Sequence, residues 1–112
     1  MPKRVLLDEC LPRQLKRSLP EHEVLTVPDA GWAGKENGEL LGLAAEAYDV
    51  FVTVDRNVTL QQNVDKLEIA IVVLVARGNR LKDLMPLVPA LRRAPESVER
   101  GQVVRLNGRG DR

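Results

Sequence analysis

Five acidic residues stand at the ends of hydrophobic segments or at the start of a predicted helix. Asp8 and Glu9 follow the first apolar run, Asp29 and Asp55 follow two later runs, and Glu39 falls in a first helical turn. Carboxylate oxygens are the ligands that Mg²⁺ and Mn²⁺ prefer, and a metal held this way activates water and stabilises a phosphoryl transition state. Because crowded carboxylates repel one another, the pattern requires a cation, either a divalent metal or a basic side chain.

The elements between these acids predict how they are brought together. Short apolar runs predict strands at residues 4–7, 23–27, 49–55, 69–75 and 102–106. Helical spacing of leucine and alanine predicts helices at 12–19, 36–48 and 60–67 and a fourth from about residue 80. This alternation predicts an α/β fold, a three-layer sandwich whose mostly parallel sheet has about five strands and helices on both faces.

A parallel sheet places all strand carboxyl ends along one edge, where ligands bind in such folds. We therefore expect the five acids to meet at this edge. His22 precedes the second strand and is expected at the opposite edge. Asn79 is expected to cap the fourth helix, which Pro86 and Pro89 must kink or interrupt. The run at 69–75 is apolar throughout, which is typical of a central strand covered on both faces.

Length and composition are those of one ordinary domain. The chain has 112 residues, a formal net charge of +1 and a single cysteine, Cys10, so no internal disulfide is expected. No signal peptide and no apolar stretch near the ~20 residues of a membrane span are found, which predicts a cytoplasmic protein with no membrane contact. We expect a domain over residues 1–106 and a flexible tail over 107–112.

The segment "LLDECLP" resembles the LLDENLP opening of a bacterial PIN-like family, largely uncharacterised and often linked to toxin–antitoxin loci. The resemblance continues through "DAGWAGKENGELLGLAAEAYDVFVTVDRN" and "IAIVVLVARGNRLKDLMPLVPAL" and extends to about Leu106. It implies a PIN-like Rossmann-type sandwich with an Mg²⁺- or Mn²⁺-dependent ribonuclease centre. It also implies an RNA substrate, a cognate antitoxin and, as for many small toxins, a homodimer.

Matching the family's motifs assigns roles to individual residues. Asp8, Glu39 and Asp55 take the positions of the catalytic and metal-binding acids. Many relatives carry a further acid two residues after the third-strand aspartate, where this chain has Asn57, and an amide binds metal without contributing charge. Cys10 replaces the usual asparagine of the first motif.

Several neighbours of these acids have more than one interpretation. Asp29 is a candidate to supply the charge missing from the second position of the third-strand motif. Arg56, Arg77 and Arg80 follow the third and fourth strands, and they either bind RNA phosphates or neutralise the acids in the free protein. Any one acid, taken alone, could simply stabilise a helix start.

Two other functions compete with a nuclease. A catalytically weak or inactive PIN-like module would bind RNA or a partner protein, and the presence of Asn57 favours it. A phosphoacceptor receiver domain would also place acids at Asp8 and Glu9 and an aspartate at Asp55. Receivers, however, carry Thr or Ser after the fourth strand and Lys after the fifth, where this chain reads Ala76–Arg77 and Arg105–Leu106.

The sequence also predicts where the three aromatic side chains lie. Tyr48 and Phe51 are predicted to be core residues, whereas Trp32 lies in a glycine-flanked loop near the acids, where it shapes a cleft or a dimer contact. Because the chain has only three aromatic side chains, it has little capacity for base stacking, and RNA would be recognised through its backbone and shape.

Overall fold

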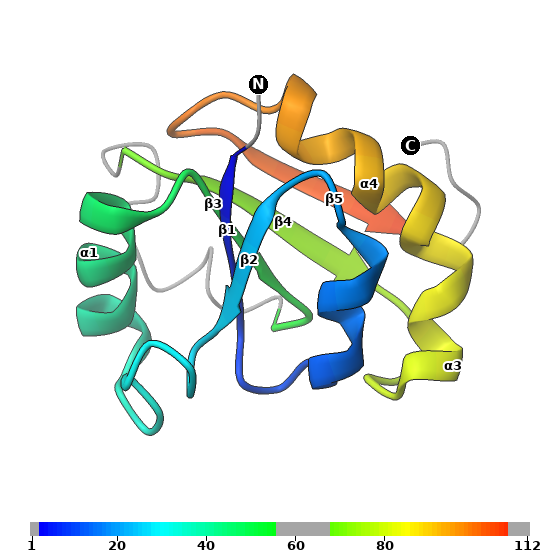
Figure 1. Cartoon of the computed structure of the whole chain (residues 1–112), viewed down its shortest axis with the longest axis horizontal. Helices are drawn as coiled ribbons and strands as arrows, with labels where there is room; N and C mark the ends of the chain where they lie inside the picture. The colour runs from blue at the N-terminus through cyan, green and yellow to red at the C-terminus, as the bar shows by residue number, and fades with distance from the viewer. Residues whose placement is uncertain (1–2, 56–67, 108–112) are drawn as a thin grey trace.

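The fold is built on one parallel sheet. The computed structural model describes residues 3–55 and 68–107. Its strands are β1 (Arg4–Leu7), β2 (Glu23–Thr26), β3 (Val50–Thr53), β4 (Ala70–Val75) and β5 (Val103–Asn107). They pair in the order β2-β1-β3-β4-β5, every pair parallel, as drawn in Figure 1. The predicted α/β class and the parallel five-stranded sheet are thereby confirmed.

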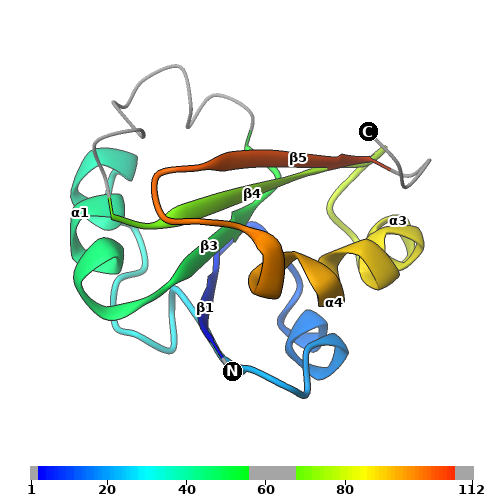
Figure 2. The same ribbon diagram turned by 90° about the horizontal axis from the view of Figure 1, so that it is seen from above.

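Helices cover both faces of this sheet and make three layers. They are η1 (Arg13–Ser18), α1 (Asn37–Ala47), α3 (Leu81–Leu84), η3 (Met85–Leu87) and α4 (Val88–Ser97). Figures 1 and 2 show α1 on one face and η1, α3 and α4 together on the other. No helix in the described ranges has the length and apolar character needed to cross a membrane.

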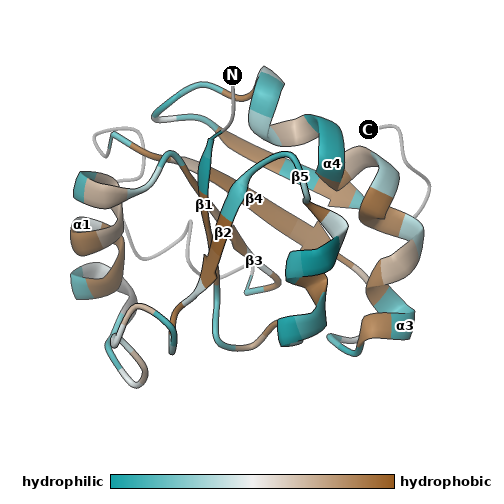
Figure 3. Ribbon diagram, viewed as in Figure 1, coloured by the Kyte–Doolittle hydropathy of each residue, from teal (hydrophilic) through white to brown (hydrophobic). Residues whose placement is uncertain are grey.

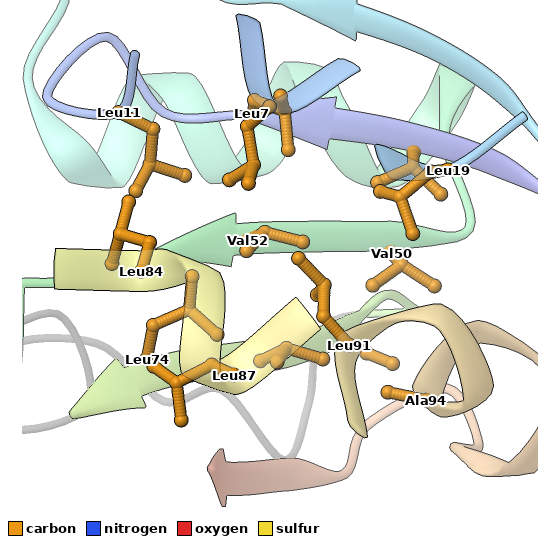
Figure 4. Packing of buried hydrophobic residues seen from close by; sticks show 14 residues of the cluster. Leu7, Leu11, Leu19, Val50, Val52, Leu74, Leu84, Leu87, Leu91 and Ala94 are labelled. Atoms are coloured by element: carbon orange, nitrogen blue, oxygen red, sulfur yellow. The ribbon is translucent and has the colours of Figure 1, made fainter. Parts of the chain in front are cut away.

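The face below η1, α3 and α4 is closed by aliphatic side chains. Leu7, Val52 and Leu74 of the sheet meet Leu87 and Leu91, all at most 1% exposed (Figure 4). In Figure 3 the hydrophobic colour runs along the central strands, while the ribbons of η1 and α4 alternate between hydrophilic and hydrophobic colours. Residues Ala70–Leu74 of β4 are buried throughout, and β4 has a strand on either side, which confirms its prediction as a central strand.

The opposite face packs on α1. Its apolar side was predicted to comprise Leu40, Leu41, Ala44, Ala45 and Tyr48; all are buried except Ala45, which is partly buried against them. Phe51 is fully buried in the same cluster. The ring of Trp32 packs edge-on against Tyr48 with centroids 6.0 Å apart and contributes to the margin of this core.

Two local predictions need correction. The segment after Pro12 forms a short 3-10 helix that Pro12 caps, yet its leucines at 11, 15 and 19 are still buried as expected. Arg80, and not Asn79, occupies the N-cap of α3; the Asn79 amide instead donates to the Cys10 carbonyl at 2.8 Å. Pro86 and Pro89 do interrupt the fourth helix, which divides into α3, η3 and α4. The helix predicted at 60–67 lies outside the described residues.

The strand order creates one natural binding position. The chain moves outward from β1 to β2 and then crosses back to β3 on the other side of β1. In doubly wound sheets of order 2-1-3-4-5, ligands bind outside the carboxyl ends of the strands where this reversal occurs, between β1 and β3. Asp8 follows β1 directly, and Asp55 lies two residues after the end of β3.

Candidate functional site

Asp8 is a buried carboxylate at the carboxyl end of β1. Its backbone N–H continues the ladder to β3 by donating to the Val52 carbonyl at 2.9 Å. Its side chain is 9% exposed, and its Oδ2 accepts the Thr53 hydroxyl at 2.6 Å while Oδ1 accepts the Glu9 backbone N–H at 2.8 Å. A buried carboxylate is tolerated only with such donors, so the two strands hold Asp8 in one orientation.

Thr53 is the residue that links the two strand ends. Its side chain is fully buried, and its hydroxyl both donates to Asp8 and accepts the Asp55 backbone N–H at 3.0 Å. The hydroxyl thus fixes the Asp8 carboxylate relative to the first residues after β3. Sequence reasoning did not single out Thr53. The available signal was a hydroxyl residue ending the otherwise apolar strand "VFVT", because a buried hydroxyl needs a partner.

Cys10 completes the surroundings of Asp8. Its Sγ lies 3.4 Å from Asp8 Oδ2 and 3.9 Å from Thr53 Oγ1. Burial is the largest cause that raises the pKa of the Cys10 thiol, and the Asp8 charge adds to it. Cys10 is therefore a neutral S–H donor at neutral pH and is not an activated nucleophile.

Asp29 has its own cations away from Asp8. Its Oδ2 accepts the Thr26 N–H at 3.1 Å and the Lys16 ammonium at 3.1 Å, and Arg13 lies 3.5 Å from Oδ1. The Thr26 N–H, followed by Lys16, lowers the pKa of this carboxyl to about 2. Asp29 therefore joins the end of β2 to η1, a contact that the sequence did not reveal.

Glu39 lies in the first turn of α1, as predicted. Its side chain is 62% exposed and pairs with Lys35 at 3.4 Å, four residues earlier. Glu9, the neighbour of Asp8, accepts the Gly34 N–H at 3.0 Å and so contacts the loop that precedes α1. Both carboxylates border the same edge of the sheet and have protein partners of their own.

The expected crowding of five acids is not found in the part of the chain that the structure describes. Within residues 3–55 and 68–107, no three His, Cys, Asp or Glu side chains form a group that could hold a metal ion. Mg²⁺, however, commonly uses only one or two carboxylates and completes its shell with water and substrate phosphate. Asp8 fits such a role. A carboxylate has about four acceptor positions, and protein donors use three of them on Asp8.

Basic side chains follow β4 at the same edge. Arg77 and Arg80 are exposed, and neither forms an ion pair with a carboxylate of the described residues. Arg77 and Lys82 line a hollow of ≈ 730 Å³ between the ends of β4 and β5. Arg56 and Asn57 lie outside the described residues, so their predicted roles stay predictions.

Comparison of the chain with protein-family models, curated proteins and solved structures finds no match. A functional proposal therefore depends on the geometry at the ends of β1 and β3 and on the sequence motifs that lie there.

Proposed function

We propose that the chain is a metal-dependent endoribonuclease of the PIN-like type, with its centre at the reversal of strand order between β1 and β3. One observation carries the proposal: Thr53 holds the buried Asp8 carboxylate and the backbone of Asp55 with a single hydroxyl. The position agrees with the first-strand and third-strand acids of the "LLDE" and "TVD" motifs. Aspartate side chains are rarely this buried unless they are paired, and here the Thr53 hydroxyl is one of the donors that pair with Asp8.

Asp8 and Asp55 are the residues that would hold Mg²⁺ or Mn²⁺. Glu39, Asp29 and Asn57 are further candidates, of which Glu39 and Asp29 would first have to leave their lysine partners. When bound, the ion would supply an activated water and stabilise the negative charge of a phosphodiester under attack. Oxygen ligands without histidine favour these hard cations over zinc.

The protein's own groups position the parts of this site. Thr53 and the Glu9 N–H fix the orientation of the Asp8 carboxylate and leave part of its acceptor capacity for a metal ion. Arg77 and Arg80 would bind RNA phosphates bidentately, and Arg56 would join them. Since neither Arg77 nor Arg80 is ion-paired within the described residues, their guanidinium groups need not give up a carboxylate partner to bind RNA.

The biological setting of the proposal comes from the family resemblance. It makes the protein the toxin of a toxin–antitoxin pair, inhibited by a cognate antitoxin and able to form a homodimer; we propose that this toxin acts in the cytoplasm. These partners are part of the proposal and would be tested by co-purification with the product of a neighbouring gene.

The test is RNA cleavage by the purified protein with Mg²⁺, with Mn²⁺ and with EDTA. We expect Asp8→Asn and Asp55→Asn each to abolish the metal-dependent cleavage. Glu46→Gln, an exposed acid on the far end of α1, serves as the matched control and should cleave like the original protein. Full metal-dependent activity in Asp8→Asn would show that the proposed centre is wrong.

A second candidate is an inactive module of the same fold that binds RNA or a partner. The observation in its favour is that no three acids gather within the described residues. Such a module would bind RNA equally well with Asp8→Asn, lose binding with Arg77→Ala and Arg80→Ala, and cleave nothing. A phosphoryl group gained at Asp55 from acetyl phosphate would instead indicate a receiver.

A further inference from the structure

A second hollow lies at the opposite end of the sheet from Asp8. This β2–α4 groove, of ≈ 650 Å³, is lined mainly by His22, Val88, Pro89, Arg92, Arg93 and Glu96. It lies between the residues that lead into β2 and one side of α4; Figure 1 shows the positions of these two elements. It shares no residue with the site at the ends of β1 and β3.

His22 leaves a buried hydrogen-bond donor without a partner in this groove. Its side chain is 1% exposed, and its Nδ1 accepts the Lys3 backbone N–H at 3.0 Å. Because Nδ1 is an acceptor, the neutral ring carries its proton on Nε2. Nε2 is buried and has no hydrogen-bond partner; the nearest acidic oxygen, Oε2 of Glu96, lies 3.9 Å away, beyond hydrogen-bond distance.

The same tautomer decides which ligands His22 can take. A metal ion needs a lone pair on the ring, but the Nδ1 lone pair is used by Lys3 and Nε2 carries the proton. A hydroxyl group fits instead, since its oxygen can accept from Nε2–H and its proton can be donated to the Glu96 carboxylate. The pair therefore presents a donor and an acceptor side by side.

The arginines of α4 indicate that the ligand also has an anionic group. Arg92 is paired with Glu21 at 2.5 Å, whereas Arg93 forms no ion pair within the described residues. An unpaired guanidinium binds carboxylate and phosphate oxygens well. The apolar surfaces of Val88 and Pro89, one turn away on the same helix, can contact a carbon skeleton.

We propose that the β2–α4 groove binds a small hydroxylated anion, with a hydroxyl between His22 and Glu96 and its oxyanion on Arg93. In the structure the Glu96 carboxylate lies 3.9 Å from Nε2, and its side chain is 53% exposed. To admit the hydroxyl, this carboxylate would turn toward solvent and then accept the hydrogen bond of the hydroxyl. The ligand class is that of phosphorylated polyols and hydroxy acids.

His22 is the one histidine of the chain, so its ring nitrogens give an unambiguous NMR signal. Nitrogen-15 spectra of the full chain should show the Nε2–H tautomer. Titration with glycerol 3-phosphate should shift the Nε2 signal, while glycerol or inorganic phosphate alone should bind at least about tenfold more weakly, since each offers only part of the contacts. Arg93→Ala and Glu96→Gln should each weaken glycerol 3-phosphate binding, and Arg17→Ala on η1 should not.

Three results would overturn the proposal. One is an unchanged His22 signal up to about 10 mM glycerol 3-phosphate, well above the ~1 mM dissociation constant of a weak small-molecule site; water alone would then satisfy Nε2–H. Another is a shift of the His22 Nε2 signal with inorganic phosphate as large as that with glycerol 3-phosphate, which would show that the ligand's hydroxyl does not contribute to binding. The third is the Nδ1–H tautomer. None of these outcomes depends on RNA cleavage.

Discussion

Replacing Thr53 by valine tests the arrangement at the ends of β1 and β3 directly. Valine has nearly the same shape but lacks the hydroxyl that donates to Asp8 Oδ2 at 2.6 Å and accepts the Asp55 N–H at 3.0 Å. The fully buried position of Thr53 means that water does not simply replace the lost group. Thr53→Val should therefore destabilise the protein and release the Asp8 carboxylate from its fixed orientation.

The size of this destabilisation follows from the two hydrogen bonds that Thr53→Val removes. A hydrogen bond to a charged group contributes about 1.5–3 kcal/mol, and leaving the Asp55 N–H without its acceptor adds up to about 1 kcal/mol. The expected loss in the free energy of unfolding is thus about 1.5–4 kcal/mol, out of roughly 5–15 kcal/mol for a domain. At about 4 °C per kcal/mol for a chain of this size, Tm should fall by about 6–16 °C.

Urea unfolding followed by circular dichroism and by the fluorescence of the single tryptophan, Trp32, would measure this loss. Thr53→Ser is the matched control. It keeps the hydroxyl and removes one buried methyl group, so it should cost only about 1 kcal/mol.

A double-mutant cycle that combines Thr53→Val with Asp8→Asn tests whether Asp8 is the partner of the Thr53 hydroxyl. Residues in direct contact should show a coupling of about 0.5–3 kcal/mol. Strictly additive effects of Thr53→Val and Asp8→Asn, or equal losses in Thr53→Val and Thr53→Ser, would refute the reasoning. The hydroxyl would then contribute nothing to holding the carboxylate.

Three other predictions concern single residues. The Thr26 N–H and Lys16 lower the pKa of Asp29 from 3.8 to about 2. Asp29→Asn should therefore destabilise the protein above about pH 4, and the difference in stability between variant and original should vanish as the pH falls through about 2. Urea unfolding at a series of pH values would measure this difference. Burial raises the pKa of the Cys10 thiol above 9.0, so iodoacetamide at pH 8 should alkylate the folded chain more slowly than the urea-unfolded chain. Gly42→Ala in α1, where an added Cβ meets nothing within 4 Å, should stabilise the protein by about 0.5–1 kcal/mol in thermal melts.

Most of the elements follow from local patterns in the sequence. The run "RVLL" predicts β1 with its observed bounds, and the apolar stripe of residues 40–48 predicts the buried side of α1. The periodicity of apolar residues reports which side chains are buried, so the strands, the helical segments and the central position of β4 could be predicted. Periodicity does not report helix type, which is why the segment after Pro12 was expected to be an α-helix and is a 3-10 helix.

The sequence also placed Asp8, Asp55 and Glu39 at the correct edge of the sheet, because each follows a strand or begins a helix there. It did not reveal their partners. Asp29 meets Lys16, thirteen residues earlier, and Glu39 meets Lys35, so these two acids do not join Asp8 in a cluster within the described residues. Burial patterns carry no information on which donor reaches which oxygen.

By itself, the sequence determined the alternation of strands and helices and the presence of carboxylates after β1 and β3. Only the tertiary structure decided that β3 lies beside β1, with Leu7 opposite Val52, and so that Thr53 reaches Asp8 across 45 residues of chain. It likewise brought Lys3 and Glu96 to the two nitrogens of His22. The physical reason is that strand order and register arise from the packing of whole layers, and hydrogen-bond partners are fixed only when that packing is complete.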